Sequence, residues 1–225
     1  MATAVDGNWT AKAAVAFFAV NIVAIVAAII SGYEMGALTH RFEERQAITF
    51  LSSNQLAATA IVAWIIFLLA RSLRTTKPSR RQASFWAFSA FGFLYLMLDE
   101  AFQFHEGMDT TFFRLFGVET DPMLDGAPTA IYGVLAAALC YYFRREITRY
   151  SATLSFFLLG GFFLAVTSFL NLGMATTVQI VVEECAKLLG VVSFLLGHLA
   201  ALAGVIREAA TDHAPGADPV SRQLT

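Results

Sequence analysis

Apolar residues form six long runs along the chain, and polar residues concentrate in the short segments between them. An apolar run of about 18 or more residues is long enough to cross the hydrocarbon core of a bilayer as a helix. The pattern therefore predicts transmembrane helices at residues 13–31, 48–73, 84–104, 127–143, 153–172 and 177–206. We expect an all-α integral membrane protein, a six-helix bundle forming one domain over residues 1–207. The polar remainder, residues 208–225, is expected to be a disordered cytoplasmic tail.

The amino-acid composition also indicates an integral membrane protein. The 225 residues are 57% hydrophobic and only 14% charged, whereas a soluble domain carries about 25% charged residues. The first twelve residues contain one acid, Asp6, and one base, Lys12. A signal peptide begins with a positively charged segment, so we expect the first apolar run to be retained as a helix.

Basic residues predict how the helices are oriented. They cluster after the second, fourth and sixth apolar runs, at Arg71, Arg74, Lys77, Arg80, Arg81, Arg144, Arg145, Arg149 and Arg207. With six spans these regions lie on one side, and loops rich in Lys and Arg stay in the cytoplasm. Both termini are therefore expected to be cytoplasmic, in a multi-pass protein of the inner (plasma) membrane. Because topology accounts for the bases, no nucleic-acid surface is expected, and the lipid bilayer is the main partner.

Acidic residues concentrate at the opposite, outer side. The run from Asp99 to Glu106 ends the third span, and Glu183 and Glu184 lie about two turns into the sixth span. His40 and Glu44 precede the second span, whose outer half holds Ser52. Ionisable groups at membrane depth are costly and mark functional sites by default. Three helices are thus expected to bring polar groups to one depth.

Carboxylates mixed with imidazoles suit iron, manganese or zinc, so the leading hypothesis is a metal site at the outer face. Its expected ligands come from His40, Glu44, Asp99, Glu100, His105, Glu106 and Glu184. Lys187 and Glu183 have the i, i+4 spacing of a side-chain pair and are the expected catalytic residues. The corresponding function is a membrane enzyme or redox protein acting on a lipid-soluble or small substrate. At 100° per residue Asp99 and Glu106 share a helical face, and either Glu100 or His105 turns toward the interior.

Two other functions fit the same residues. Protonation of Asp99 or Glu184 could drive a proton- or cation-coupled transporter, with His198 as the polar residue nearest the inner side. Alternatively, the chain is an accessory subunit of a larger membrane complex or a homo-oligomer, and the cluster is a docking or stabilising feature. In a separate interpretation the outer acids form a solvated rim with ordinary helix-end ion pairs. An ion pair of Lys187 with a neighbouring glutamate would then be purely structural.

Overall fold

The computed structural model describes residues 9–42, 46–72, 80–104, 127–170 and 176–212, and all the regular structure in these ranges is helical. Five of the helices are long and apolar enough to cross a membrane, so the chain is a helical membrane protein. The helices are α1 (Trp9–Glu34), α2 (Ala47–Ser72), α3 (Arg80–Phe102), α5 (Ala127–Tyr142), α6 (Arg144–Ile147), α7 (Ser151–Leu170) and α8 (Thr177–Asp212).

The expectation of six spans is met in five helices and not in α5. Helices α1, α2, α3, α7 and α8 match five predicted spans. Helix α5 has 16 residues, a length of about 24 Å, against a hydrocarbon core of about 30 Å. The residues before it, 105–126, lie outside the described ranges. Among the described helices, five therefore qualify as spans and the sixth falls short by length.

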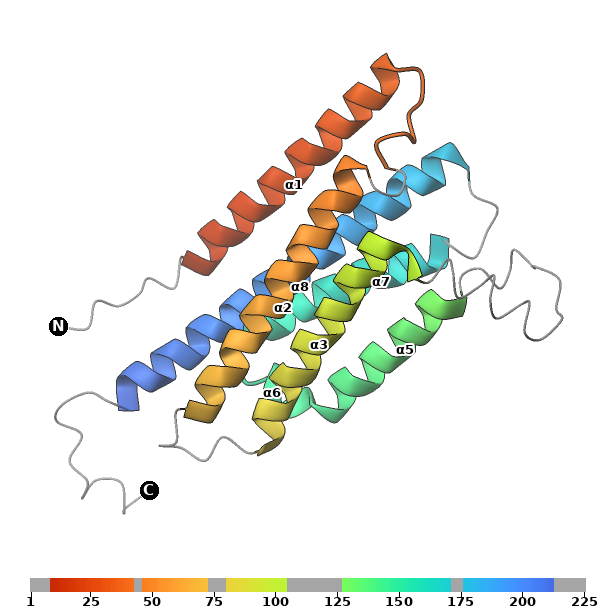
Figure 1. The fold of residues 1–225 in the computed structure, drawn as a ribbon. Coiled ribbons are helices and arrows are strands. Elements are labelled where there is room, and N and C mark those ends of the chain that lie inside the picture. The colour runs from red at the N-terminus through yellow and green to blue at the C-terminus, as the bar shows by residue number, and fades with distance from the viewer. Residues whose placement is uncertain (1–8, 43–45, 73–79, 105–126, 171–175, 213–225) are drawn as a thin grey trace, which may run out of the picture.

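Successive long helices run in opposite directions, so that the start of α1 and the end of α8 lie at the same end of the bundle (Figure 1). The most extensive packing joins α2 to α3 and α7 to α8, and α8 also packs along α2 and α1. Helix α8 supplies several fully buried residues, including Leu188, Val192 and Ala201. It is the central helix, because it packs against α7, α2 and α1.

A seven-residue spacing of glycines holds α7 against α8. Gly190, Gly197 and Gly204 lie on one face of α8, because seven residues make almost two full turns. A Cβ atom added at Gly190 would lie 3.3 Å from Cβ of Phe163, and one at Gly197 would lie 2.7 Å from the Phe157 ring. At Gly204 the added atom would overlap the Tyr150 ring. Glycine thus lets the aromatic side chains of α7 sit directly on the α8 backbone, the close approach typical of membrane helices.

The ends of two helices differ from the predicted ones. Helix α3 ends at Phe102, and Gln103 adopts a left-handed conformation with φ of 58° while its N–H donates to the Asp99 carbonyl. The helical face extrapolated from Asp99 toward Glu106 is therefore interrupted at Gln103. Helix α8 continues to Asp212, so residues 208–212 of the predicted tail are helical, and the rest of that tail lies outside the described ranges.

Candidate functional site: a carboxylate–lysine cluster

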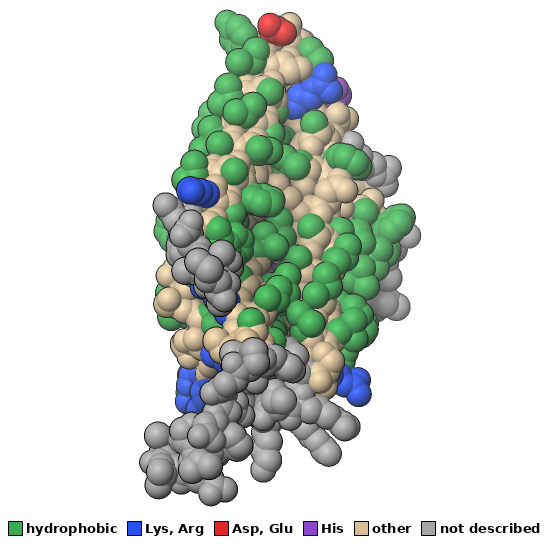
Figure 2. Space-filling model, turned by 90° about the vertical axis from the view of Figure 1, so that its left-hand side faces the viewer, with side chains coloured by type: hydrophobic (Ala, Val, Ile, Leu, Met, Phe, Trp, Pro, Cys, Tyr) green, Lys and Arg blue, Asp and Glu red, His purple; other side chains and the backbone are tan. Residues whose placement is uncertain are grey.

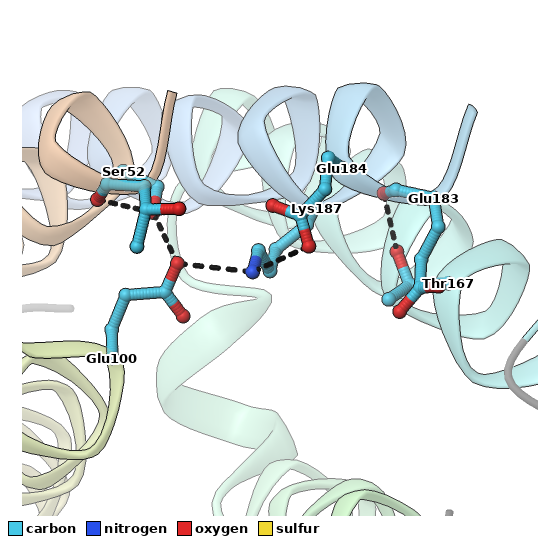
Figure 3. Close-up of polar contacts among 7 residues, drawn as sticks. Ser52, Glu100, Thr167, Glu183, Glu184 and Lys187 are labelled. Carbon is cyan, nitrogen blue, oxygen red and sulfur yellow. Dashed lines mark hydrogen bonds and ion pairs between the residues drawn. The ribbon is translucent and has the colours of Figure 1, made fainter. Parts of the chain in front are cut away.

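Three helices contribute side chains to one buried polar cluster, which we call the carboxylate–lysine cluster: Ser52, Glu100, Glu184 and Lys187. Ser52 lies in the second turn of α2 and Glu100 in the last turn of α3. Glu184 and Lys187 are three residues apart on α8 and therefore share a face. Figure 3 shows the carboxylate of Glu100 reaching from α3 toward Lys187 and Ser52.

Lys187 is shared by two carboxylates. Its Nζ lies 3.0 Å from Oε1 of Glu100 and 2.8 Å from Oε1 of Glu184. The Ser52 hydroxyl donates to the same Glu100 oxygen at 2.8 Å. One carboxylate oxygen on α3 thus interacts with α2 and α8 at once. The Glu100–Lys187 pair connects different helices, whereas the Glu184–Lys187 pair lies within α8.

The cluster is largely withdrawn from solvent. Glu100 is 9% exposed and Glu184 8% exposed, and the neighbouring Asp99 is 7% exposed. Fully ionised, these three acids and Lys187 carry two net negative charges. The ammonium group of Lys187 therefore compensates only part of the charge of these acids.

Sequence reasoning left open whether Glu100 turns inward, and the structure shows that it does. Glu184 is the recorded ion-pair partner of Lys187 on α8. Glu183 lies beside α7, where its backbone carbonyl accepts a hydrogen bond from Thr167 at 3.5 Å (Figure 3). The pairing of Glu183 with Lys187 stays a prediction, and the pairing of Glu184 with Lys187 is observed at i, i+3. Ser52 is a partner that the analysis placed at the right depth without assigning it to the site.

The predicted metal ligands fall into two sets. Glu44, His105 and Glu106 lie outside the described residues. Asp99, Glu100 and Glu184 are buried in the bundle, and His40 lies in the turn after α1. Within the described ranges, no group of three or more His, Cys, Asp or Glu side chains is arranged to hold a metal ion. The ammonium group of Lys187 lies within ion-pair distance of both Glu100 and Glu184.

A second polar contact, near the other end of the bundle, joins the same two helices. The imidazole of His198 on α8 is fully buried, and its Nε2 lies 2.7 Å from Oγ of Ser89 on α3. The rings of Trp86, Phe93 and Phe157 surround it with centroids 5.1–5.6 Å away. Sequence analysis treated His198 as a residue of the inner side. The Ser89 partner was missed because nothing in the local sequence links positions 109 residues apart.

A further buried contact joins α1 to α2 by side-chain amides. Gln55 on α2 donates to Asn21 on α1 at 2.8 Å, and Asn21 donates to the Phe17 carbonyl. Asn21 is fully buried, although α1 is otherwise an apolar helix with many exposed aliphatic side chains. A lone asparagine in an apolar span is the signal that would have predicted this contact, because interhelical hydrogen bonds between amides help to hold membrane helices together.

Comparison with known proteins identifies a family without a described activity. Residues 9–202 match the family model described as a domain of unknown function (DUF8692). No curated protein and no solved structure matches the chain. The match covers all the described spans up to the inner part of α8, and the chain belongs to the DUF8692 family.

Proposed function

For this helical membrane member of the DUF8692 family, we propose a proton-coupled transport function centred on the carboxylate–lysine cluster. Protonation of Glu100 weakens the contact between α3 and α8 at this cluster, and deprotonation restores it. We place the protein in the inner (plasma) membrane with six spans and both termini in the cytoplasm, α5 serving as the short sixth span. The observation that carries the proposal is Lys187 held between carboxylates of two helices at 3.0 and 2.8 Å.

The distribution of charge supports the orientation. On the face drawn in Figure 2, Lys and Arg side chains lie mainly toward the lower end, and acidic side-chain atoms are visible at the upper end, where a basic group also lies. The basic end includes Arg71 in the last turn of α2, Arg144 and Arg145 in α6, and Arg149 before α7. Loops of this composition remain cytoplasmic. Helix α5 runs beside α3 with the opposite direction (Figure 1), as a crossing helix would.

Because two carboxylates share one lysine, the two ion pairs of the cluster differ: one joins α3 to α8, and the other lies within α8. If Glu100 takes up a proton, it loses its charge and most of its attraction for Lys187. The ammonium group is not left alone, because Glu184 on the same helix still neutralises it. An unpaired buried charge costs several kcal/mol, and the retained partner avoids most of that cost. A single proton can therefore change the contact between helices without stranding a charge.

Helix packing indicates that this contact matters for movement. Helix α3 packs extensively against α2, and α8 packs extensively against α7, whereas α3 does not pack extensively against α8. The two pairs of helices are joined by the packing of α2 against α8, and the Glu100–Lys187 pair adds a side-chain contact between α3 and α8. Weakening one side-chain contact of this kind shifts an equilibrium between two arrangements without unfolding either pair.

The test is a pH-dependent distance between α3 and α8. Spin labels would replace Ala101 on α3 and Val178 on α8, both exposed, in a variant whose Cys140 and Cys185 are replaced by alanine. In lipid nanodiscs we expect a second, longer distance to appear as the pH falls. Glu100→Gln should show that longer distance at every pH, because it mimics the protonated acid.

Glu208→Gln provides a matched control for this experiment. Glu208 also forms an ion pair, with Arg149 at 2.7 Å, but its side chain is 44% exposed and the pair lies at the other end of α8. This variant should retain the wild-type response to pH. A distance distribution that is identical at all pH values would assign the cluster a structural role, as expected of an accessory subunit, and would overturn the proposal.

A further inference from the structure

We propose that Ser89 and His198 form a second, catalytic site, in which Ser89 accepts an acyl group from a fatty acyl ester or thioester. Ser89 is the nucleophile and His198 is the general base. The site is separate from the carboxylate–lysine cluster: eleven residues along α8, about 16 Å, separate His198 from Lys187. The inference goes beyond the proposed transport function and does not depend on it.

Hydrogen bonding fixes the state of the imidazole. Nδ1 of His198 lies 2.7 Å from the carbonyl oxygen of Phe194, which can only accept. Nδ1 therefore carries the proton, and in the neutral ring Nε2 is left as an acceptor. The Ser89 hydroxyl lies 2.7 Å from Nε2 and donates to it. A serine hydroxyl bonded to a histidine that a third group orients is the arrangement by which enzymes activate a serine nucleophile.

Several other hydroxyls in the spans donate to a backbone carbonyl of their own helix. Ser193 donates to the Leu189 carbonyl at 2.7 Å and Thr59 donates to the Gln55 carbonyl at 2.7 Å, each four residues earlier on its own helix. Such a bond satisfies a hydroxyl within an apolar helix. Ser89 is instead bonded to an imidazole on another helix. Among the serines that the structure describes in the spans, Ser89 is bonded to an imidazole, and Ser52 is bonded to the Glu100 carboxylate.

A hydrogen-bond donor without an acceptor lies beside this pair. Trp86 is 1% exposed, and its Nε1–H has no hydrogen-bond partner. Trp86 precedes Ser89 by three residues on α3, which places both on one face, and its ring centroid is 5.6 Å from that of His198. Buried donors are nearly always satisfied. Acyl transfer needs a donor for the carbonyl oxygen that becomes negative, and Trp86 Nε1–H is available for it.

The depth of Ser89 within the α3 span indicates which class of substrate can reach it. The apolar span of α3 begins at Ala83, so Ser89 lies about 9 Å inside it. Ser89 is half-buried, whereas His198 behind it is fully buried. A carbonyl that reaches this depth belongs to a molecule that partitions into hydrocarbon. A long-chain acyl ester or thioester meets that requirement.

The chemical step balances with water or an alcohol as second substrate. Oγ of Ser89 forms a bond to the carbonyl carbon while its proton passes to Nε2 of His198. As the bond between the acyl carbon and the leaving oxygen or sulfur breaks, the imidazolium returns that proton to the leaving group. Water or an alcohol then attacks the acyl-serine, and His198 again takes and returns one proton.

The test uses a fluorophosphonate with a long alkyl chain, which forms a bond to an activated serine and releases fluoride. Detergent-purified full-length protein would be treated with it and analysed by intact-protein and peptide mass spectrometry. We expect one adduct, at Ser89, in the wild-type chain and in Ser193→Ala. It should be absent in Ser89→Ala and form roughly 100-fold more slowly in His198→Gln, which can keep the hydrogen bonds but is no base.

Two results would overturn the assignment. One is the absence of an adduct at Ser89 in wild-type protein that is folded by its unfolding transition. The other is equal labelling rates in the wild-type chain and in a folded His198→Gln variant, since a purely structural histidine would leave the rate unchanged. Glu100→Gln should label like the wild type, so failure of the transport proposal leaves this result unaffected.

Discussion

Helices α3 and α8 are joined at two depths by polar contacts of opposite character. At one level Glu100 and Lys187 carry formal charges, and their side chains are about 10% and 21% exposed. At the other level Ser89 and His198 are joined by a short hydrogen bond, and the imidazole has no exposed surface. In the proposed function the charged contact responds to a single proton, because protonation would remove one of its charges. The neutral contact has both imidazole nitrogens satisfied and rings packed around it, so it is held in one geometry.

The comparison separates two uses of polarity inside a membrane protein. A charged pair is suited to a conformational switch when it can be broken and re-formed at a low cost in free energy, and Lys187 has a second partner that allows this. A preorganised hydrogen bond is worth most when nothing around it moves, which is what a catalytic geometry requires. Substitutions at the two levels should therefore differ in what they change as well as in how much.

Lys187→Met should have the largest effect on stability. It removes the cation between Glu100 and Glu184 and leaves two buried acids without it, which we expect to cost about 3–5 kcal/mol. The measurement is chemical unfolding in mixed micelles at neutral pH. The loss should shrink as the pH falls, because protonated acids no longer need the ammonium group.

Glu208→Gln is the comparison for that measurement. Its pair with Arg149 is substantially exposed, and such pairs contribute up to about 1 kcal/mol. Equal losses for Lys187→Met and Glu208→Gln would contradict the view that the cluster is a buried and energetically distinct site.

Ser89→Ala should have a smaller effect on stability. Nε2 of His198 loses its donor in a site that has no exposed surface, and an unsatisfied buried group costs about 1–3 kcal/mol. Unlike Lys187→Met, the loss should be nearly constant across the pH range in which the imidazole stays neutral. Unfolding of Ser89→Ala at several pH values, with Ser193→Ala as control, measures this difference. A loss for Ser89→Ala that varies with pH as strongly as that for Lys187→Met would remove the distinction between the two contacts.

Metal removal should have the smallest effect. With Lys187 between the two glutamates, we expect treatment with a chelator to leave the unfolding temperature unchanged. Elemental analysis of protein purified without chelator checks the same point directly. Near-stoichiometric iron, manganese or zinc that is lost in a folded Asp99→Ala/His105→Ala/Glu106→Ala variant would restore the metal site predicted from the sequence. Binding of that kind raises stability by mass action, so chelation would then lower the unfolding temperature.

The sequence predicts the spans well because a span requires only local information. An apolar run of sufficient length must form its backbone hydrogen bonds internally, and a helix is the structure that does so. This reasoning locates α2 and α7 to within three residues at each end. It places the end of α3 two residues too late, because the run of side chains through Phe104 gives no sign of the left-handed turn at Gln103.

Contacts between helices are much less accessible to sequence reasoning. The depth of Ser52, Glu100 and Glu184 follows from counting residues along each span, and the structure places these residues together. The choice of partners does not follow, because rotation of each helix about its axis depends on packing against its neighbours. Lys187 pairs with Glu184 and Glu100, and the spacing along α8 alone did not predict the contact with Glu100 on α3. The Ser89–His198 contact depends on the same rotations, and the residues that flank Ser89 and His198 in the sequence give no sign of it.

The glycines of α8 have a consequence for how the molecule can move. They recur every seven residues and contact in turn Phe163 and Phe157 of α7 and Tyr150, the residue before α7. Sliding α7 along α8 by a small amount would press an aromatic ring against a side chain larger than hydrogen. The next alignment that places rings over glycines lies about 10.5 Å away, roughly a third of the hydrocarbon thickness. Small shifts of α7 along α8 are therefore blocked by side chains, and a conformational change of this protein must move the two helices together as one rigid body.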